Sequence, residues 1–461
     1  MSSPLPPSKV PVRGHPPGLY LLFTTEMWER MSYYGMRALL VLYMVDKQRG
    51  GFGWDQKWAL QVYGLYTGLV YLTPVAGGYL ADRYLGQRRA VTIGGVLMML
   101  GHFLMAVPGV AAFYAALALL ILGNGMFKPN ISTMVGGLYQ QGDPRRDGAF
   151  TIFYMGINLG AFLSPLVCGT LGEKFGWHWG FGAAGVGMGL GLLAFLLGQK
   201  KLLGDVGLAP APRTAASVAA EKSVKLTGVE IDRVLVILIL SIFVIFFWAA
   251  FEQAGGLMNL YTDEKVDRVV FGWEVPTTWF QAINPAIIVL LGPVFSVIWT
   301  GLAKRNLDPP TPVKMALGLI LLSFGFVLMM GASKQSEAVG KAGIYWIVGA
   351  YFFHTVGELC LSPVGLSMVT KLAPAKFASL LMGVWFLSSS VANYLAGFIG
   401  GFSKELGEFQ LFGAIVVATA VAGVVLLAVS RRIRRMMHGA DDTESAALAN
   451  PEGGPSLSQS S

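Results

Sequence analysis

The sequence predicts an all-α integral membrane protein whose twelve spans form two bundles of six. Of its 461 residues 54% are hydrophobic and only 13% are charged, and the mean hydropathy is +0.58. Twelve apolar stretches are long enough to cross a bilayer, which takes about 20 helical residues. A polar segment in the middle of the chain separates the first six stretches from the last six. These features exclude an ordinary soluble globular domain.

The twelve expected spans can be read in chain order. They cover residues 20–45, 58–82, 90–107, 110–129, 150–172, 178–198, 232–260, 279–303, 312–331, 343–370, 378–402 and 410–430. Each is bounded by charged, glycine-rich or proline-rich residues. The expected division of the chain is an N-terminal tail at 1–18, a bundle at 19–198, a linker at 199–231, a second bundle at 232–430, and a basic, then disordered tail at 431–461.

The distribution of basic residues predicts the orientation, because cytoplasmic loops are enriched in lysine and arginine. With a cytoplasmic N-terminus, the basic clusters fall in cytoplasmic loops and the C-terminal tail. They are Arg83, Arg88, Arg89, Arg145, Arg146, Lys200, Lys201, Lys304, Arg305, Lys371, Lys376, Arg431, Arg432, Arg434 and Arg435. We therefore expect a multi-pass protein of the inner or plasma membrane with both termini cytoplasmic. Topology explains the net charge of +8, so no nucleic-acid partner is expected.

Two cysteines, Cys168 and Cys360, lie within expected helices, and nothing about them indicates a disulfide or a metal site. The chain has no metal-ligand cluster, no nucleophile beside a base and no nucleotide-binding loop. We therefore expect no enzyme activity, no metal and no cofactor.

Seven ionisable residues lie inside expected spans, and four of them are on the first: Glu26, Glu29, Arg30 and Arg37. Together with Tyr33 and Tyr34 they fall within roughly 140° of one helical face. The other three are Lys128, Glu252 and Glu358. Each unpaired charge at mid-membrane costs about 2.5–3.5 kcal/mol on insertion scales, so these groups must pair. Intramembrane charges mark substrate and ion pathways, which makes the chain a transporter candidate.

Segment 78–89 (GYLADRYLGQRR) resembles the G-x-x-x-D-R-x-x-G-x-R-R motif of the major facilitator superfamily, which latches helices and binds no substrate. Three further segments resemble motifs of the proton-dependent oligopeptide transporter (PTR) family of that superfamily. They are 26–35 (EMWERMSYYG), 153–160 (FYMGINLG) and 247–253 (FWAAFEQ). Segments 123–130, 280–285 and 357–363 extend the resemblance over residues 18–435.

The resemblance implies a proton-coupled symporter that imports di- and tripeptides by alternating access, with the proton gradient as its energy source. Peptides are zwitterions, so their site needs a cation at one end and an anion at the other. By resemblance, Arg37 and Lys128 would face the carboxylate, and Asn158, Asn284 and Glu358 the amino group. The remaining expected substrate-binding residues are Tyr33, Tyr34, Tyr71, Trp248, His354, Ser362 and Trp385.

Charge counting also suggests proton coupling. Glu26, Glu29, Glu252 and Glu358 stand against Arg30, Arg37 and Lys128, which leaves one excess negative charge that one proton would neutralise. The expected coupling residues are Glu26, Glu29, Arg30 and Lys128, with protonation of Glu26 or Glu29 loosening their hold on Arg30 and Lys128. Lys128 could instead be only a counter-ion. Arg37 and Glu252 are the expected extracellular gate, and a static ion pair is the alternative.

Three departures from the family pattern bear on these expectations. Segment 199–231 is too short and polar for the two extra helices that many bacterial relatives carry between the bundles. His354 stands where relatives often have tryptophan, and the second span lacks the histidine that some relatives use for protons. A carrier of nitrate or another small solute and a non-transporting peptide sensor remain alternatives. The expected partners are peptides, protons and membrane lipid, and a monomer is expected.

Overall fold

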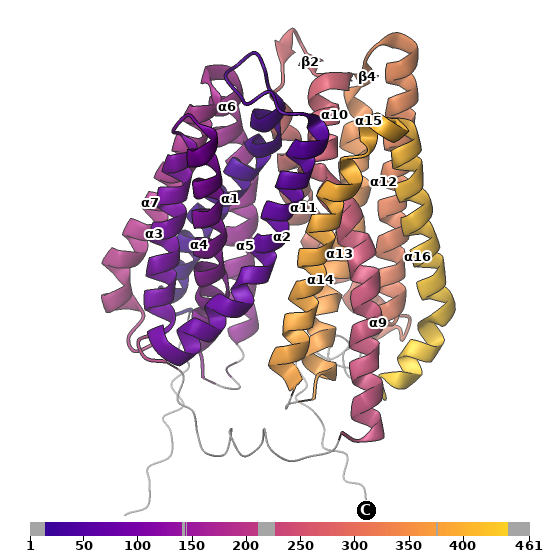
Figure 1. Cartoon of the computed structure of the whole chain (residues 1–461). Coiled ribbons are helices and arrows are strands. Elements are labelled where there is room, and N and C mark those ends of the chain that lie inside the picture. The colour runs from indigo at the N-terminus through magenta and orange to yellow at the C-terminus, as the bar shows by residue number, and fades with distance from the viewer. Residues whose placement is uncertain (1–13, 141–142, 144, 211–225, 375–376, 441–461) are drawn as a thin grey trace, which may run out of the picture.

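The computed structural model describes residues 14–140, 143, 145–210, 226–374 and 377–440, and it forms two helical bundles side by side (Figure 1). The outermost parts of both expected tails and much of the expected linker lie outside the described residues. We call the end of Figure 1 that carries α6, α10 and α15 the upper end, and the opposite end the lower end.

The N-bundle contains the elements up to residue 202. They are α1 (Pro17–Val45), α2 (Gln56–Leu80), the π-helical turn η1 (Ala81–Leu85), α3 (Gln87–Met105), α4 (Val110–Gly137), α5 (Arg146–Ser164), the π-helical turn η2 (Pro165–Gly169), α6 (Thr170–Phe175) and α7 (Trp177–Leu202). Its buried core runs from Leu19 to Leu203 and includes one residue of the other half, Leu260.

The C-bundle contains the remaining helices and has a core of its own, from Val236 to Met437. The helices are α9 (Gly228–Phe251), the 3-10 turn η3 (Glu252–Ala254), α10 (Leu257–Lys265), the 3-10 helix η4 (Thr277–Ala282), α11 (Ile283–Lys304), α12 (Thr311–Val339), α13 (Ile344–Leu372), α14 (Ala378–Gly400), α15 (Ser403–Leu406) and α16 (Glu408–Met436).

Two small sheets accompany the C-bundle at the upper end. β1 (Val266–Asp267) pairs in parallel with β4 (Ala342–Gly343), and β2 (Val269–Val270) pairs in antiparallel fashion with β3 (Trp273–Glu274).

Nine helical segments in the described part of the chain are long and apolar enough to cross a membrane. The charged α1 is not among them, although it is 29 residues long. Its four ionisable residues lower its hydropathy, and they are tolerated because the neighbouring helices bury them. The chain is thus a multi-pass membrane protein, and the number of twelve crossings stays a prediction.

The bounds of some elements differ from those expected. α7 continues to Leu202, and α9 begins at Gly228 because Thr227 and Glu230 form a capping box there. The expected span 232–260 is interrupted after Phe251, and the chain is helical beyond the expected end of that span, as far as Lys265. Gly255 and Gly256 lie between η3 and α10, and glycine has a low helix propensity.

The bundles approach each other most closely toward the upper end, where α2 crosses α14. A Cβ added to Gly397 would lie 2.2 Å from the carbonyl oxygen of Leu60, so only glycine fits at this crossing. Nearby, Lys57 Nζ lies 2.6 Å from Glu405 Oε1, and Gln56 Nε2 donates to Ser403 Oγ at 2.9 Å. In Figure 1 the ribbons of the two halves diverge toward the lower end.

The loop between α1 and α2 is organised by Asp46. Its Oδ2 accepts hydrogen bonds from the indole N–H of Trp177 at 2.9 Å and from the backbone N–H of Arg49 at 2.8 Å. Partial burial would raise the pKa of Asp46, but these donors outweigh it and hold the pKa below its ordinary value. The loop is therefore fixed by an ionised carboxylate.

Candidate functional site

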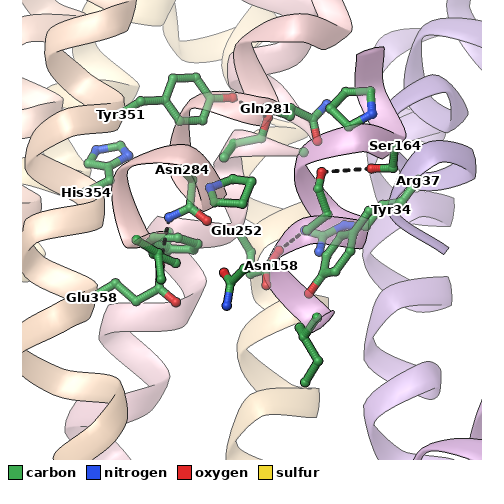
Figure 2. A pocket seen from close by; sticks show the side chains of 18 of the residues that line it. Tyr34, Arg37, Asn158, Ser164, Glu252, Gln281, Asn284, Tyr351, His354 and Glu358 are labelled. Carbon is green, nitrogen blue, oxygen red and sulfur yellow. Dashed lines mark hydrogen bonds and ion pairs between the residues drawn. The ribbon is translucent and has the colours of Figure 1, made fainter. Parts of the chain in front are cut away.

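A cavity of about 180 Å³ lies between the two bundles (Figure 2). Its polar and aromatic lining residues come from both halves. They are Tyr34, Arg37, Tyr71, Tyr154, Asn158, Ser164, Trp248, Phe251, Glu252, Gln281, Asn284, Tyr351, His354 and Glu358. Figure 2 shows Arg37 and Tyr34 on one side, and His354 and Glu358 on the other.

On the side of α1, the guanidinium of Arg37 is paired with the carboxylate of Glu252, which begins η3. Arg37 Nε also donates to the hydroxyl of Tyr63 at 2.6 Å. A Cβ at Gly255 would lie 1.9 Å from that hydroxyl, so the glycine leaves the space in which Tyr63 meets Arg37. The pair joins the two bundles at the wall of the cavity, and its role as a gate stays a prediction.

On the opposite side, Glu358 is held by an amide. Asn284 Nδ2 donates to Glu358 Oε2 at 2.8 Å and lies 3.1 Å from Thr355 Oγ1. Tyr351, His354 and Glu358 follow one another at helical spacing and therefore share one face of α13. The cavity thus has a carboxylate on one wall and, across it, a guanidinium.

Asn158 lies between these walls in Figure 2. Its Nδ2 donates to the carbonyl oxygen of Tyr154 at 2.9 Å, one helical turn earlier on α5. Asn158, Asn284 and Glu358 were expected together at one end of a substrate, and all three line this cavity.

Below Tyr34, α1 carries a second charged cluster that is nearly inaccessible to solvent. Arg30 Nε lies 3.1 Å from Glu26 Oε1 and is also hydrogen-bonded to Glu29. Asn124 Nδ2 lies 3.4 Å from Glu29 Oε1. Among the residues that the structure describes, Glu26 Oε2 has no hydrogen-bond partner. Two carboxylates therefore share one guanidinium, and one of their four oxygens is buried alone.

Lys128 lies at the edge of the site and does not line the cavity. Its Nζ is 4.4 Å from the ring centroid of Tyr71, which does line it. Within the described ranges no carboxylate oxygen lies within 4 Å of Lys128 Nζ, so Glu26 and Glu29 act on it through their charges at longer range and make no direct ion pair with it. The ring face of Tyr71 offers this ammonium a cation–π contact.

Three more of the expected substrate residues lie outside the cavity wall. Tyr33 is only 2% exposed and belongs to the N-bundle core, and its ring packs edge-on against that of Tyr34. Trp385 is packed against Gly365, where an added Cβ would meet its ring at 2.6 Å. Ser362 lies about one helical turn after Glu358 on α13, and its hydroxyl is buried.

The sequence interpretation missed several lining residues: Tyr154, Ser164, Phe251, Gln281 and Tyr351. Tyr154, Phe251 and Gln281 lie inside segments that were recognised as motifs, but no role was given to them. Tyr351 could have been found because it lies one turn before His354 on the same helical face. Tyr63, the partner of Arg37, lies on the span that lacks the histidine of some relatives, and no role was given to it.

Other candidate chemistry is limited. Cys168 and Cys360 are free thiols buried in the two bundles. In the described part of the chain no three His, Cys, Asp or Glu side chains are placed so that they could hold a metal ion. The chemistry of this site is therefore that of charges and amides around a cavity.

Comparison with known proteins agrees with this geometry. A model of the POT family matches residues 88–207 and 208–415. The peptide transporter YePEPT of Yersinia enterocolitica is 38% identical, over 94% of this chain and 97% of its own. The di-/tripeptide transporter of Lactococcus lactis subsp. cremoris is 34% identical, over 92% of this chain and 97% of its own.

Solved structures agree as well. A crystal structure of a mutant peptide transporter POT in complex with alafosfalin superposes with a TM-score of 0.86 and 41% identity. The match covers 94% of this chain and 98% of that one. Because the likeness extends over nearly the whole length of each protein, this chain belongs to the POT family.

Proposed function

We propose that this protein is a proton-coupled symporter that imports di- and tripeptides by alternating access. One observation carries the proposal: a single cavity between the bundles has Arg37 on one wall and Glu358 with Asn284 on the other. A short peptide has a carboxylate and an ammonium at its two ends, and charge-assisted hydrogen bonds would bind both. The aromatic residues between these groups offer surfaces that tolerate many side chains.

The relatives support the substrate class. One is named a di-/tripeptide transporter, and a related structure holds alafosfalin. The opposed charges of the cavity favour a zwitterion over nitrate, which would need cations alone. A sensor that does not transport needs no proton site, whereas Glu26 and Glu29 place one more carboxylate in the membrane than Arg30 can neutralise.

The proton site we infer is the cluster of Glu26, Glu29 and Arg30. One guanidinium serves two carboxylates there, and Glu26 Oε2 is buried with no partner among the described residues. A lone carboxylate oxygen in a low-dielectric interior is costly, and proton uptake removes the charge. Protonation would weaken the hold of the pair on Arg30 and change the electrostatic field at Lys128, which interacts with the charges of both carboxylates and lies against the ring of Tyr71.

The orientation follows from the basic residues. Arg83 and Arg89, with Arg431, Arg432 and Arg435, lie at or near the lower ends of the helices, so we assign the lower end to the cytoplasm. Both termini would then be cytoplasmic. The conformation described here, with the bundles joined at the upper end, would be the inward-facing one, and Arg37 with Glu252 would form part of the closed extracellular gate.

The test is uptake of labelled dialanine by proteoliposomes with an acidic exterior and an inside-negative potential, with and without a protonophore. A potential of about 100 mV supplies about 2.3 kcal/mol per charge and one pH unit about 1.4 kcal/mol, so coupled uptake exceeds equilibrium by several hundred-fold at most. Accumulation that collapses with the protonophore supports symport. Binding of dialanine without uptake would identify a sensor, and absence of both would identify a carrier of another solute.

A further inference from the structure

A third junction between the bundles lies at the upper end, outside the cavity wall. It joins α6 of the N-bundle to η4 of the C-bundle. Its central residue is Glu173, whose carboxylate accepts three hydrogen bonds from the first residues of η4. No motif in the sequence pointed to this residue.

The geometry of these bonds is favourable. Glu173 Oε2 accepts from the backbone N–H of Thr277 at 2.8 Å, and Oε1 accepts from the backbone N–H of Thr278 at 2.9 Å. Oε1 also accepts from the hydroxyl of Thr278 at 2.7 Å. Backbone N–H groups in the first turn of a helix have no partner within the helix, so a carboxylate from outside can satisfy them. Both threonines are fully buried in this conformation.

The surrounding residues keep the two elements close. A Cβ on Gly169 would lie 2.0 Å from Thr278 Oγ1, so the absence of a side chain at 169 lets η4 approach. Trp279 Nε1 donates to Thr170 Oγ1 at 2.8 Å. The hydroxyl of Thr277 donates to Asp263 on α10 at 2.7 Å, and this bond anchors η4 within its own bundle. Separation of the bundles here must therefore break the bonds of Glu173.

We propose that Glu173 is a second gate residue, which positions η4 against α6 and stabilises closure of the upper end independently of the Arg37–Glu252 pair. The proposal rests on alternating access as the proposed function. When this end opens, the hydrogen bonds between the carboxylate and the two backbone N–H groups would break, and both partners would bind water. A charged acceptor that satisfies three buried donors biases the equilibrium toward the closed form.

The experiment measures how often the upper end opens. Ser403 on α15 is 2% exposed and accepts a hydrogen bond from Gln56 across the bundle interface. A thiol introduced by Ser403→Cys should react with a polar maleimide only when this interface opens, so its labelling rate is proportional to the open population. Ser403 belongs to the α2–α15 junction and makes no described hydrogen bond to α6 or η4.

We expect Glu173→Gln to raise the labelling rate at least tenfold and Glu173→Ala to raise it further, because glutamine keeps one neutral acceptor and alanine keeps none. Gly169→Ala should act in the same direction by wedging Thr278 away. The matched control is Lys174→Gln. Lys174 is the next residue of α6 and donates one exposed bond to the carbonyl of Glu274, so its loss should change the rate less than twofold.

Unchanged labelling in both Glu173 variants would overturn the proposal. So would an equal rise in the reactivity of the buried native thiols of Cys168 and Cys360, because that would mean general unfolding in place of gate opening. The assay needs no peptide. A rise in labelling together with absent dialanine uptake would therefore uphold the gate and reject the proposed substrate, whereas uptake with unchanged labelling would do the reverse.

Discussion

The role of Glu358 can be tested with one substitution and two ligands. Glu358→Gln removes the charge that would bind the peptide ammonium, but it keeps the side-chain size and an oxygen that can still accept from Asn284, now 2.8 Å away. A hydrogen bond to a charged group contributes about 1.5–3 kcal/mol. We therefore expect dialanine to bind roughly 10- to 150-fold more weakly.

N-acetyl-dialanine is the control ligand because it has no ammonium group. Competition against labelled dialanine in proteoliposomes gives the affinity of each ligand for each variant. The wild type should prefer free dialanine strongly, and Glu358→Gln should lose most of that preference without a comparable loss for the acetylated peptide. An equal loss for both ligands would refute the assignment, since it would mean that the substitution disturbs the cavity as a whole.

Three further predictions follow from buried and loop charges. Glu252→Gln should lower the melting temperature and abolish uptake, because removing one partner of a buried ion pair costs about 3–5 kcal/mol. The double variant with Arg37→Gln should recover part of the lost stability. Equal melting temperatures of the single and double variants would contradict this prediction. Glu29→Gln should keep exchange of peptide across the membrane but lose proton-driven accumulation; an unchanged pH dependence of uptake would reject Glu29 as a coupling residue. Asp46→Asn should lower the melting temperature equally at pH 8 and pH 5. The pKa of Asp46 is depressed in the folded state, so its carboxylate stabilises the fold above the unfolded pKa near 4, and this stabilisation is lost as the pH falls below that value. Thermal unfolding at pH 8, 5 and 3 checks the sign. A difference in melting temperature between wild type and variant that grows toward pH 3 would contradict this reasoning.

Much of the fold could be predicted from the sequence, because apolar segment length and the polar middle segment are local properties. Long helices occupy most of the expected spans, and the family resemblance pointed to Arg37, Asn158, Asn284 and Glu358, which the fold brings to one cavity. The short helix α10 could not be predicted in this way. It follows a break in the helix at Gly255 and Gly256, where a side chain at Gly255 would collide with the hydroxyl of Tyr63, which comes from the other bundle.

The orientation of individual side chains could not be predicted from the sequence either. Tyr33 and Tyr34 are adjacent and were expected to act alike, yet only Tyr34 reaches the cavity. The helical angle of about 100° between them places one toward the partner bundle and the other toward its own core. Lys128 shows the same limit, because counting charges predicts pairs but does not predict that its ammonium group lies over the ring of Tyr71.

The charges of α1 also bear on how the protein is made. Arg30 finds its carboxylates one and four residues away on the same helix, so that group is compensated as soon as the helix forms. Arg37, in contrast, is 215 residues from Glu252. At a synthesis rate of about 5–20 residues per second, its counter-ion leaves the ribosome roughly 10–40 s later. During that interval the first helix carries an uncompensated guanidinium, so its final place in the bilayer is secured only once the second half arrives, and the N-bundle expressed alone would lack the partner that completes it.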